Sequence, residues 1–248
     1  MKLQRAARLG ACVCLVFAWA TQASAYRPFD GTDADVAAPR EFEFEVGPLG
    51  YAREGEQRFL VGPALVINYG LAPGFEAVLE GRQKWAVKHS HGTELEDVAL
   101  SLKSLLREGS LQGATGASVA LETGLLLPGS ERRFGVHVAS ILSWYWPALT
   151  LHWNLGNDLL TSFDYAATSS LILEGPMAWR VRPVAELLVA REFGEPELSS
   201  GLERSVLLGA IACWGESWSF DFGFRHGWLN GQQLDEARLG FTWALATK

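Results

Sequence analysis

The clearest pattern in the chain is a strict two-residue alternation of apolar and polar side chains near its C-terminus. In residues 218–225, WSFDFGFR, every even position carries a large aromatic side chain and every odd position a small or charged one. Side chains on a strand point alternately to its two faces, so this segment is predicted to be a strand with one apolar and one polar face. The apolar face would meet a core in a soluble sheet, or lipid in a membrane-spanning barrel.

The same alternation recurs along the chain between turn signals such as Pro73-Gly74, Pro128-Gly129 and Asn230-Gly231. An uncharged stretch, 134–157, is interpreted as two strands because Pro147 interrupts it and its second half alternates. The pattern predicts twelve strands, over 40–52, 57–71, 74–88, 94–107, 115–127, 134–146, 147–156, 164–175, 179–193, 202–214, 217–228 and 234–246.

Strand length and aromatic content favour lipid outside the sheet. Strands in a sandwich average five or six residues, whereas a tilted membrane strand needs about nine to eleven. Tryptophans concentrate near the predicted strand ends, as in the interfacial girdles of membrane barrels. We therefore predict an all-β fold, a transmembrane antiparallel up-and-down β-barrel of twelve strands. A secreted periplasmic ligand-binding β-sandwich, with the tryptophans in its core, is the alternative.

The first 25 residues have the three parts of a secretory signal. Basic residues (Lys2, Arg5, Arg8) precede a short apolar run, 9–20, and the small-residue site 23–25 follows. We predict a cleaved signal peptide at 1–25, a barrel domain at 26–248 and a location in the outer membrane.

Removal of that signal leaves an acidic chain with a single cysteine, Cys213. The formal charge falls from −7 to −10 when the three basic residues leave, which argues against a nucleic-acid partner. One cysteine excludes an internal disulfide and a thiolate metal cluster.

Several short motifs, in order, resemble a known family. Residues 26–36 (YRPFDGTDADV) and 39–47 (PREFEFEVG) are similar to the mature start of a proteobacterial outer-membrane barrel family labelled "meta-pathway of phenol degradation". Residues 69–76, 98–103, 124–129, 152–156 and 220–227 resemble its later strands and loops. The chain departs from the family in its brief segment 130–133 and in ending WALATK rather than on an aromatic residue. The resemblance implies an outer-membrane transporter of hydrophobic or aromatic solutes.

If the aromatic faces look outward, the opposite faces line a lumen containing both signs of charge. Such a lumen is either a water-filled passage or a barrel filled by ion pairs. The predicted lumen-lining residues are Glu76, Glu80, Arg82, Lys84, Asp97, Lys103, Glu122, His152, Asn154, Arg182, Glu186, Asp221, Arg225 and Arg238. Among these, Arg82, Lys84 and Lys103 are expected to pair with Glu76, Glu80 and Asp97 across neighbouring strands.

The sequence gives little support to catalysis. A serine beside His152 would complete a lipase-like arrangement, but no Gly-x-Ser-x-Gly motif singles one out. His89 and His91 supply only two possible metal ligands in a loop. We therefore predict no enzyme activity, no catalytic or metal residues and no cofactor. The predicted partners are the outer-membrane bilayer, its insertion machinery and a small-molecule solute, with a non-transporting structural barrel as the alternative function.

Overall fold

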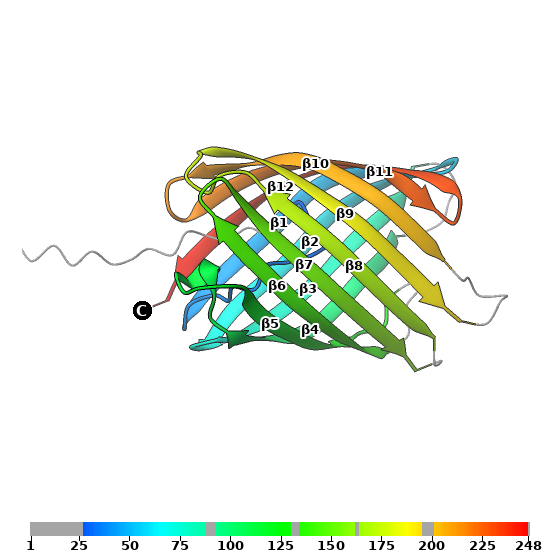
Figure 1. Ribbon diagram of the computed structural model, residues 1–248. Helices are drawn as coiled ribbons and strands as arrows, with labels where there is room; N and C mark the ends of the chain where they lie inside the picture. The colour runs from blue at the N-terminus through cyan, green and yellow to red at the C-terminus, as the bar shows by residue number, and fades with distance from the viewer. Residues whose placement is uncertain (1–26, 88–92, 130–133, 162–163, 195–200, 248) are drawn as a thin grey trace, which may run out of the picture.

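In the computed structural model, residues 27–247 are described except for 88–92, 130–133, 162–163 and 195–200. Twelve antiparallel strands form a closed barrel in which each strand pairs with its neighbours in sequence, and β1 pairs with β12 (Figure 1). The strands are β1 (Glu41–Glu54), β2 (Gln57–Ala72), β3 (Phe75–Ala86), β4 (Thr93–Arg107), β5 (Ser118–Leu126), β6 (Gly135–Trp146), β7 (Leu149–Leu160), β8 (Tyr165–Glu174), β9 (Val181–Phe193), β10 (Leu202–Trp214), β11 (Trp218–Leu229) and β12 (Gln232–Ala246).

The predicted twelve-stranded barrel is confirmed, and its closure excludes the two-sheet sandwich. The largest difference between a predicted and an observed boundary is in β7, which ends at Leu160 and not at 156. A single turn of 3-10 helix, η1 (Ser110–Gln112), follows β4, and the described residues contain no helix long and apolar enough to span a membrane. The predicted signal peptide, 1–25, and the loop histidines His89 and His91 lie outside the described residues.

The two ends of the barrel can be distinguished by the chain termini. We call the end with Glu41 and Ala246 the terminal rim, and the opposite end, with Glu54 and Leu234, the distal rim. At the distal rim β11 and β12 are joined by a two-residue turn in which Asn230 and Gly231 both have positive φ, 53° and 80°. This is the geometry that matches the twist of a tight hairpin and favours Asn-Gly.

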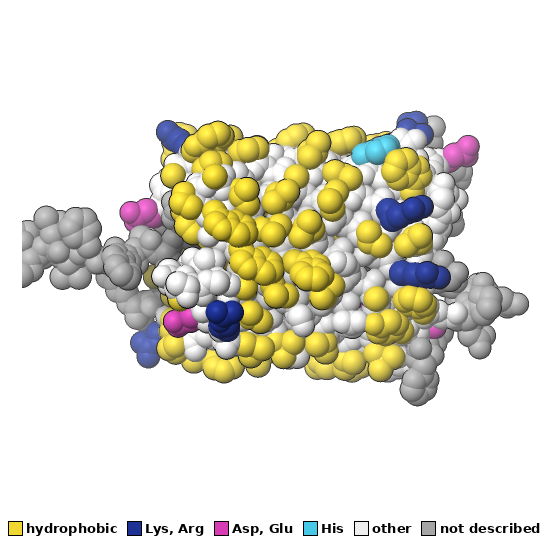
Figure 2. Space-filling model, in the orientation of Figure 1, with side chains coloured by type: hydrophobic (Ala, Val, Ile, Leu, Met, Phe, Trp, Pro, Cys, Tyr) yellow, Lys and Arg dark blue, Asp and Glu magenta, His cyan; other side chains and the backbone are white. Residues whose placement is uncertain are grey.

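The two faces of the wall separate as the alternation predicts. On β11, Phe220 and Phe222 are each 49% exposed on the outside, whereas Asp221 and Arg225 are nearly buried inside. Figure 2 shows apolar side chains covering the middle of the outer surface, with Lys and Arg gathered near its two ends. A continuous apolar belt with charges at its margins is the surface that lipid requires.

The chain before β1 lies inside the barrel. Residues 27–40, which we call the inner segment, run from the terminal rim along the lumen and hydrogen-bond to inward-facing side chains of several strands. The wall is shaped to admit it: a Cβ at Gly70 would lie 2.0 Å from the carbonyl oxygen of Ala38, and one at Gly240 would lie 2.3 Å from Nε of Arg27. Over part of the lumen, the inner segment therefore occupies the space that side chains of the wall would otherwise fill.

Candidate functional site: the barrel lumen

The backbone of the inner segment is held by side chains from the wall. Near the terminal rim, the amide of Ala37 donates to Oε2 of Glu76 at 2.5 Å. Further in, the amide of Thr32 donates to Oδ1 of Asn154 at 3.0 Å, and Nδ2 of Asn154 donates back to the Thr32 carbonyl at 2.8 Å. These bonds satisfy backbone groups that would otherwise be buried without partners, so they fix the path of the segment.

Glu186 of β9 provides a further anchor. Its Oε1 accepts from the amide of Gly31 at 2.9 Å, and its Oε2 accepts from the amide of Asp30 at 3.1 Å. The same Oε2 lies 2.8 Å from Nη2 of Arg225 on β11. Glu186 is 1% exposed and Arg225 also 1%, so this pair is shielded from water and its geometry is strongly constrained.

Asp30 is the innermost charged residue of the inner segment. Its carboxylate contacts Nη1 of Arg225 and Nη1 of Arg238, which lies midway along β12. Burial raises the pKa of Asp30, but the charges of Arg225 and Arg238 outweigh this and hold it well below its usual range. Asp30 is therefore ionised at neutral pH and bound to the wall by charge.

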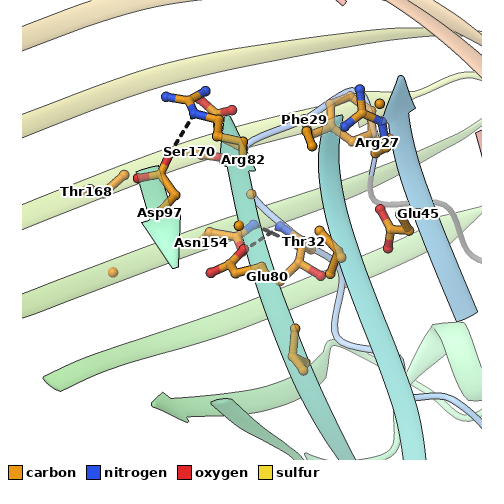
Figure 3. Close-up of a pocket in the computed structure, with 18 of the residues that line it drawn as sticks. Arg27, Phe29, Thr32, Glu45, Glu80, Arg82, Asp97, Asn154, Thr168 and Ser170 are labelled. Atoms are coloured by element: carbon orange, nitrogen blue, oxygen red, sulfur yellow. Dashed lines mark hydrogen bonds and ion pairs between the residues drawn. The ribbon is translucent and has the colours of Figure 1, made fainter. Parts of the chain in front are cut away.

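A network of ion pairs continues from Arg238 toward the distal rim. Arg238 lies 2.7 Å from Glu236, and Arg82 on β3 lies 2.9 Å from Asp97 and 3.2 Å from Glu96, both on β4. Figure 3 shows Arg82 and Asp97 facing each other at the cavity wall. Lys84 extends the network, with Nζ 2.8 Å from Glu54 and 3.3 Å from Glu96. Both signs of charge thus line the distal half of the lumen.

All fourteen predicted lumen residues lie on the inner side of the wall. The cavities are lined by Glu76, Glu80, Arg82, Lys84, Asp97, Lys103, Glu122, Asn154, Arg225 and Arg238. The remaining four, His152, Arg182, Glu186 and Asp221, are buried against other polar groups. Of the expected pairs, Arg82 and Asp97 do meet, whereas Lys103 lies opposite Glu76 and 3.6 Å from Asp33 of the inner segment.

Neighbouring cavities lie along the flank of the inner segment and on its distal side. One, of about 450 Å³, follows its flank and is lined by residues that include Arg27, Glu45, Asn68 and Glu76. The other, of about 600 Å³, lies toward the distal rim and includes the ion pairs of Arg82 and Lys84. Figure 3 shows Arg27 and Phe29 of the inner segment on the side of Glu45, and Thr32 next to Asn154, in the first cavity.

Sequence reasoning missed a Ser-His-Glu arrangement in the wall. Oγ of Ser143 lies 2.8 Å from Nδ1 of His152, whose Nε2 lies 3.1 Å from Oε1 of Glu174. Ser143 is fully buried and also accepts the amide of Ala34 at 2.9 Å. The hydroxyl is therefore covered by the inner segment, and these three side chains act in this structure as one of its anchors.

The inner segment itself is the main feature that the sequence analysis did not place. Residues 27–40 show no two-residue alternation and carry Asp30, Asp33 and Asp35, and the sequence analysis assigned them no structural role beyond the family resemblance. The length of residues 27–40, between the predicted cleavage site and β1, is the sequence feature that could have indicated their position in the lumen. A polar stretch of this length can reach well into a barrel of this height.

Several solved barrels share this architecture. The structure aligns with the COG4313 outer membrane channel from Pseudomonas putida F1 at a TM-score of 0.66 and 9% identity, over 88% of this chain and 100% of that one. It aligns with the NanC porin at 0.57 and 10%, over 82% and 100%, and with the CymD monoaromatic hydrocarbon channel at 0.50 and 8%, over 85% and 89%. No family model and no curated protein matches the sequence. The fold is thus that of outer-membrane barrel channels.

Proposed function

We propose that this protein is an outer-membrane channel for small solutes, with the terminal rim in the periplasm and the inner segment as its constriction. The observation that carries the proposal is the inner segment, which occupies the terminal part of the lumen while a cavity of about 600 Å³ stays open toward the distal rim. A barrel with only a structural role would be expected to fill this space, with wall side chains or with more of the inner segment.

The apolar outer belt supports placement in a bilayer, and the predicted signal peptide supports export to the outer membrane. The charged lining favours polar solutes, because an apolar molecule would displace water from ion pairs without replacing its hydrogen bonds. This argues against the hydrophobic solutes that the family resemblance implies. Insertion would require the barrel-assembly machinery of that membrane.

Planar-bilayer recording of the full mature chain and of a variant lacking residues 27–38 would test the proposal. The deletion keeps Arg40 and all twelve strands, so the barrel should still fold and resist unfolding by SDS without heating. We expect small conductance steps from the full chain and larger ones from the deletion variant. A correctly folded deletion variant that conducts no current would contradict the channel proposal and favour the non-transporting barrel.

A further inference from the structure

The wall formed by β1, β2 and β3 presents carboxylates to the flank of the inner segment. Glu41, Glu43 and Glu45 alternate along β1 from the terminal rim inward, and their exposed fractions are 8%, 5% and 0%. Glu76 of β3, also 0% exposed, lies two strands away on the same inner face. These residues form a column of buried carboxylates leading from the rim to the first cavity.

Three oxygen atoms of this wall lack a hydrogen-bond partner among the described residues. They are Oε2 of Glu45, Oδ1 of Asn68 and Oε1 of Glu76. Asn68 donates its Nδ2 to Oε1 of Glu45 at 3.0 Å, so its oxygen remains available. All three residues are fully buried and all three line the same cavity. Buried acceptors without donors are rare because each loses its bonds to water, so they indicate a missing donor or cation.

The charges around Glu43 strengthen this argument. The charged groups that act on it most strongly are Glu76, Glu45, Glu41 and Asp33, and all four are carboxylates. Arg27 does act on Glu45 and Lys103 on Glu76, which gives the two ends of the wall some compensation. None of the charged groups that act most strongly on Glu43 is a cation. Like charges held together out of water require either protons or cations from solution.

We propose that this wall is a binding path for monovalent cations beside the inner segment, with oxygens of Glu45, Asn68 and Glu76 as the ligands that line the cavity. Glu43, which pairs with Asn68 across β1 and β2, is the next carboxylate along the path. Carboxylate and amide oxygens are the ligands that hard cations take. The described part of the chain contains no group of three or more acidic, His or Cys side chains placed to hold a metal ion together, so the proposed ligands include the Asn68 amide oxygen.

The distal cavity carries a net negative charge, which would attract cations toward the proposed path. Its lining contains nine carboxylates, among them Glu54, Asp158 and Glu203, and four cationic side chains. An excess of one sign along a low-dielectric mouth raises the local concentration of the opposite ion. The inference rests on the proposed channel function and assigns it a solute class: the channel prefers cations to anions.

Two measurements would test the path. The first is the reversal potential of the full mature chain in a KCl gradient, for the unaltered protein and for Glu43→Gln/Glu45→Gln. We expect a several-fold preference for K⁺ over Cl⁻ that falls toward one in the double variant. Glu122→Gln is the matched control, because Glu122 lines the same cavity from β5 and lies opposite Lys103. Chloride preference, or a larger shift in the control than in the double variant, would overturn the inference.

The second measurement does not depend on conduction. Crystals grown in RbCl should show an anomalous peak between Glu45 and Asn68 that is lost in Asn68→Leu. Absence of the peak from the unaltered protein would overturn the binding path and indicate that the carboxylates carry protons. A peak in a barrel that conducts nothing, even without residues 27–38, would refute the channel function while the cation site itself stands.

Discussion

Asp30 and Arg225 form the contact that joins the inner segment to the barrel wall at mid-height, with Oδ2 of Asp30 2.5 Å from Nη1 of Arg225. The other carboxylate oxygen of Asp30 lies 2.5 Å from Nη1 of Arg238. Asp30 therefore bridges β11 and β12, whereas the rest of the segment is held mainly through its backbone amides. Arg27, which lies 3.6 Å from Asp221, and Asp33, which lies 3.6 Å from Lys103, add further charged contacts, and Asp30 contacts two arginines at once.

Asp30→Asn should loosen the inner segment and raise the mean conductance. The change leaves the two arginines with less compensation, but the Asp30 side chain is 36% exposed, so water screens the loss and the cost should be on the order of 1 kcal/mol. Arg225 also retains Glu186 and Glu203, and Arg238 retains Glu236. Asp35→Asn is the control, since it removes a charge from the same segment without touching either arginine. Equal conductance changes in the two variants would show that Asp30 has no special role.

The attachment through Asp30 should also depend on pH in a defined direction. Because the pKa of Asp30 is lowered by Arg225 and Arg238, the stabilisation is fully present above the ordinary aspartate range, near 3.8. It is lost as the pH falls below that value toward the depressed pKa of the folded state. Conductance recorded between pH 7 and pH 5 should therefore show no opening that depends on Asp30. An opening step in that interval that Asp30→Asn abolishes would contradict the low pKa.

The sequence predicted the wall of the barrel far better than its contents. Alternation at Trp218 to Arg225 determines both the strand and its facing, because a one-residue slip would move every side chain to the other face. The contacts of Asp30 could not be found in this way, because the inner segment has no regular period. Its partners, Glu186 and Arg238, are distant in sequence and come together only when the barrel closes. Ser143 and His152 differ in this respect, because they are nine residues apart in one hairpin and meet through the register of β6 and β7.

Facing along β11 can be tested by two substitutions at neighbouring positions. Phe222 is 49% exposed on the outer surface near the middle of the strand, so Phe222→Arg should destabilise the barrel by roughly 2–4 kcal/mol. Asp221→Asn should cost much less, because neither carboxylate oxygen of Asp221 has a hydrogen-bond partner among the described residues and Arg27 is 3.6 Å away. Urea-refolding curves in lipid vesicles would measure both. Equal costs would mean that the observed facing is wrong.

The predicted signal peptide and the apolar belt together lead to an expected location in the outer membrane. We expect the mature chain, beginning near residue 26, to be recovered with outer membranes after sucrose-gradient separation and to be released only by detergent. Mass spectrometry of the intact protein would give the cleavage position. Recovery from the periplasm without detergent would be incompatible with the exposed aromatic face of β11.

The ion pairs of Arg82 and Lys84 distinguish an open distal lumen from a closed one. Changing both residues to Ser removes the partners of Asp97, Glu96 and Glu54. In an open channel water can solvate the released carboxylates, so the variant should lose little stability, conduct more and shift toward cations. In a lumen closed by these pairs the carboxylates would be stranded, which costs several kcal/mol and leaves the conductance at background. The side chains of Arg82 and Lys84 are 33% and 11% exposed, so we expect the result for an open channel: little loss of stability and a higher conductance. Parallel bilayer recordings and urea titrations would decide, and an equally stable barrel with unchanged conductance would place both charges outside the solute path.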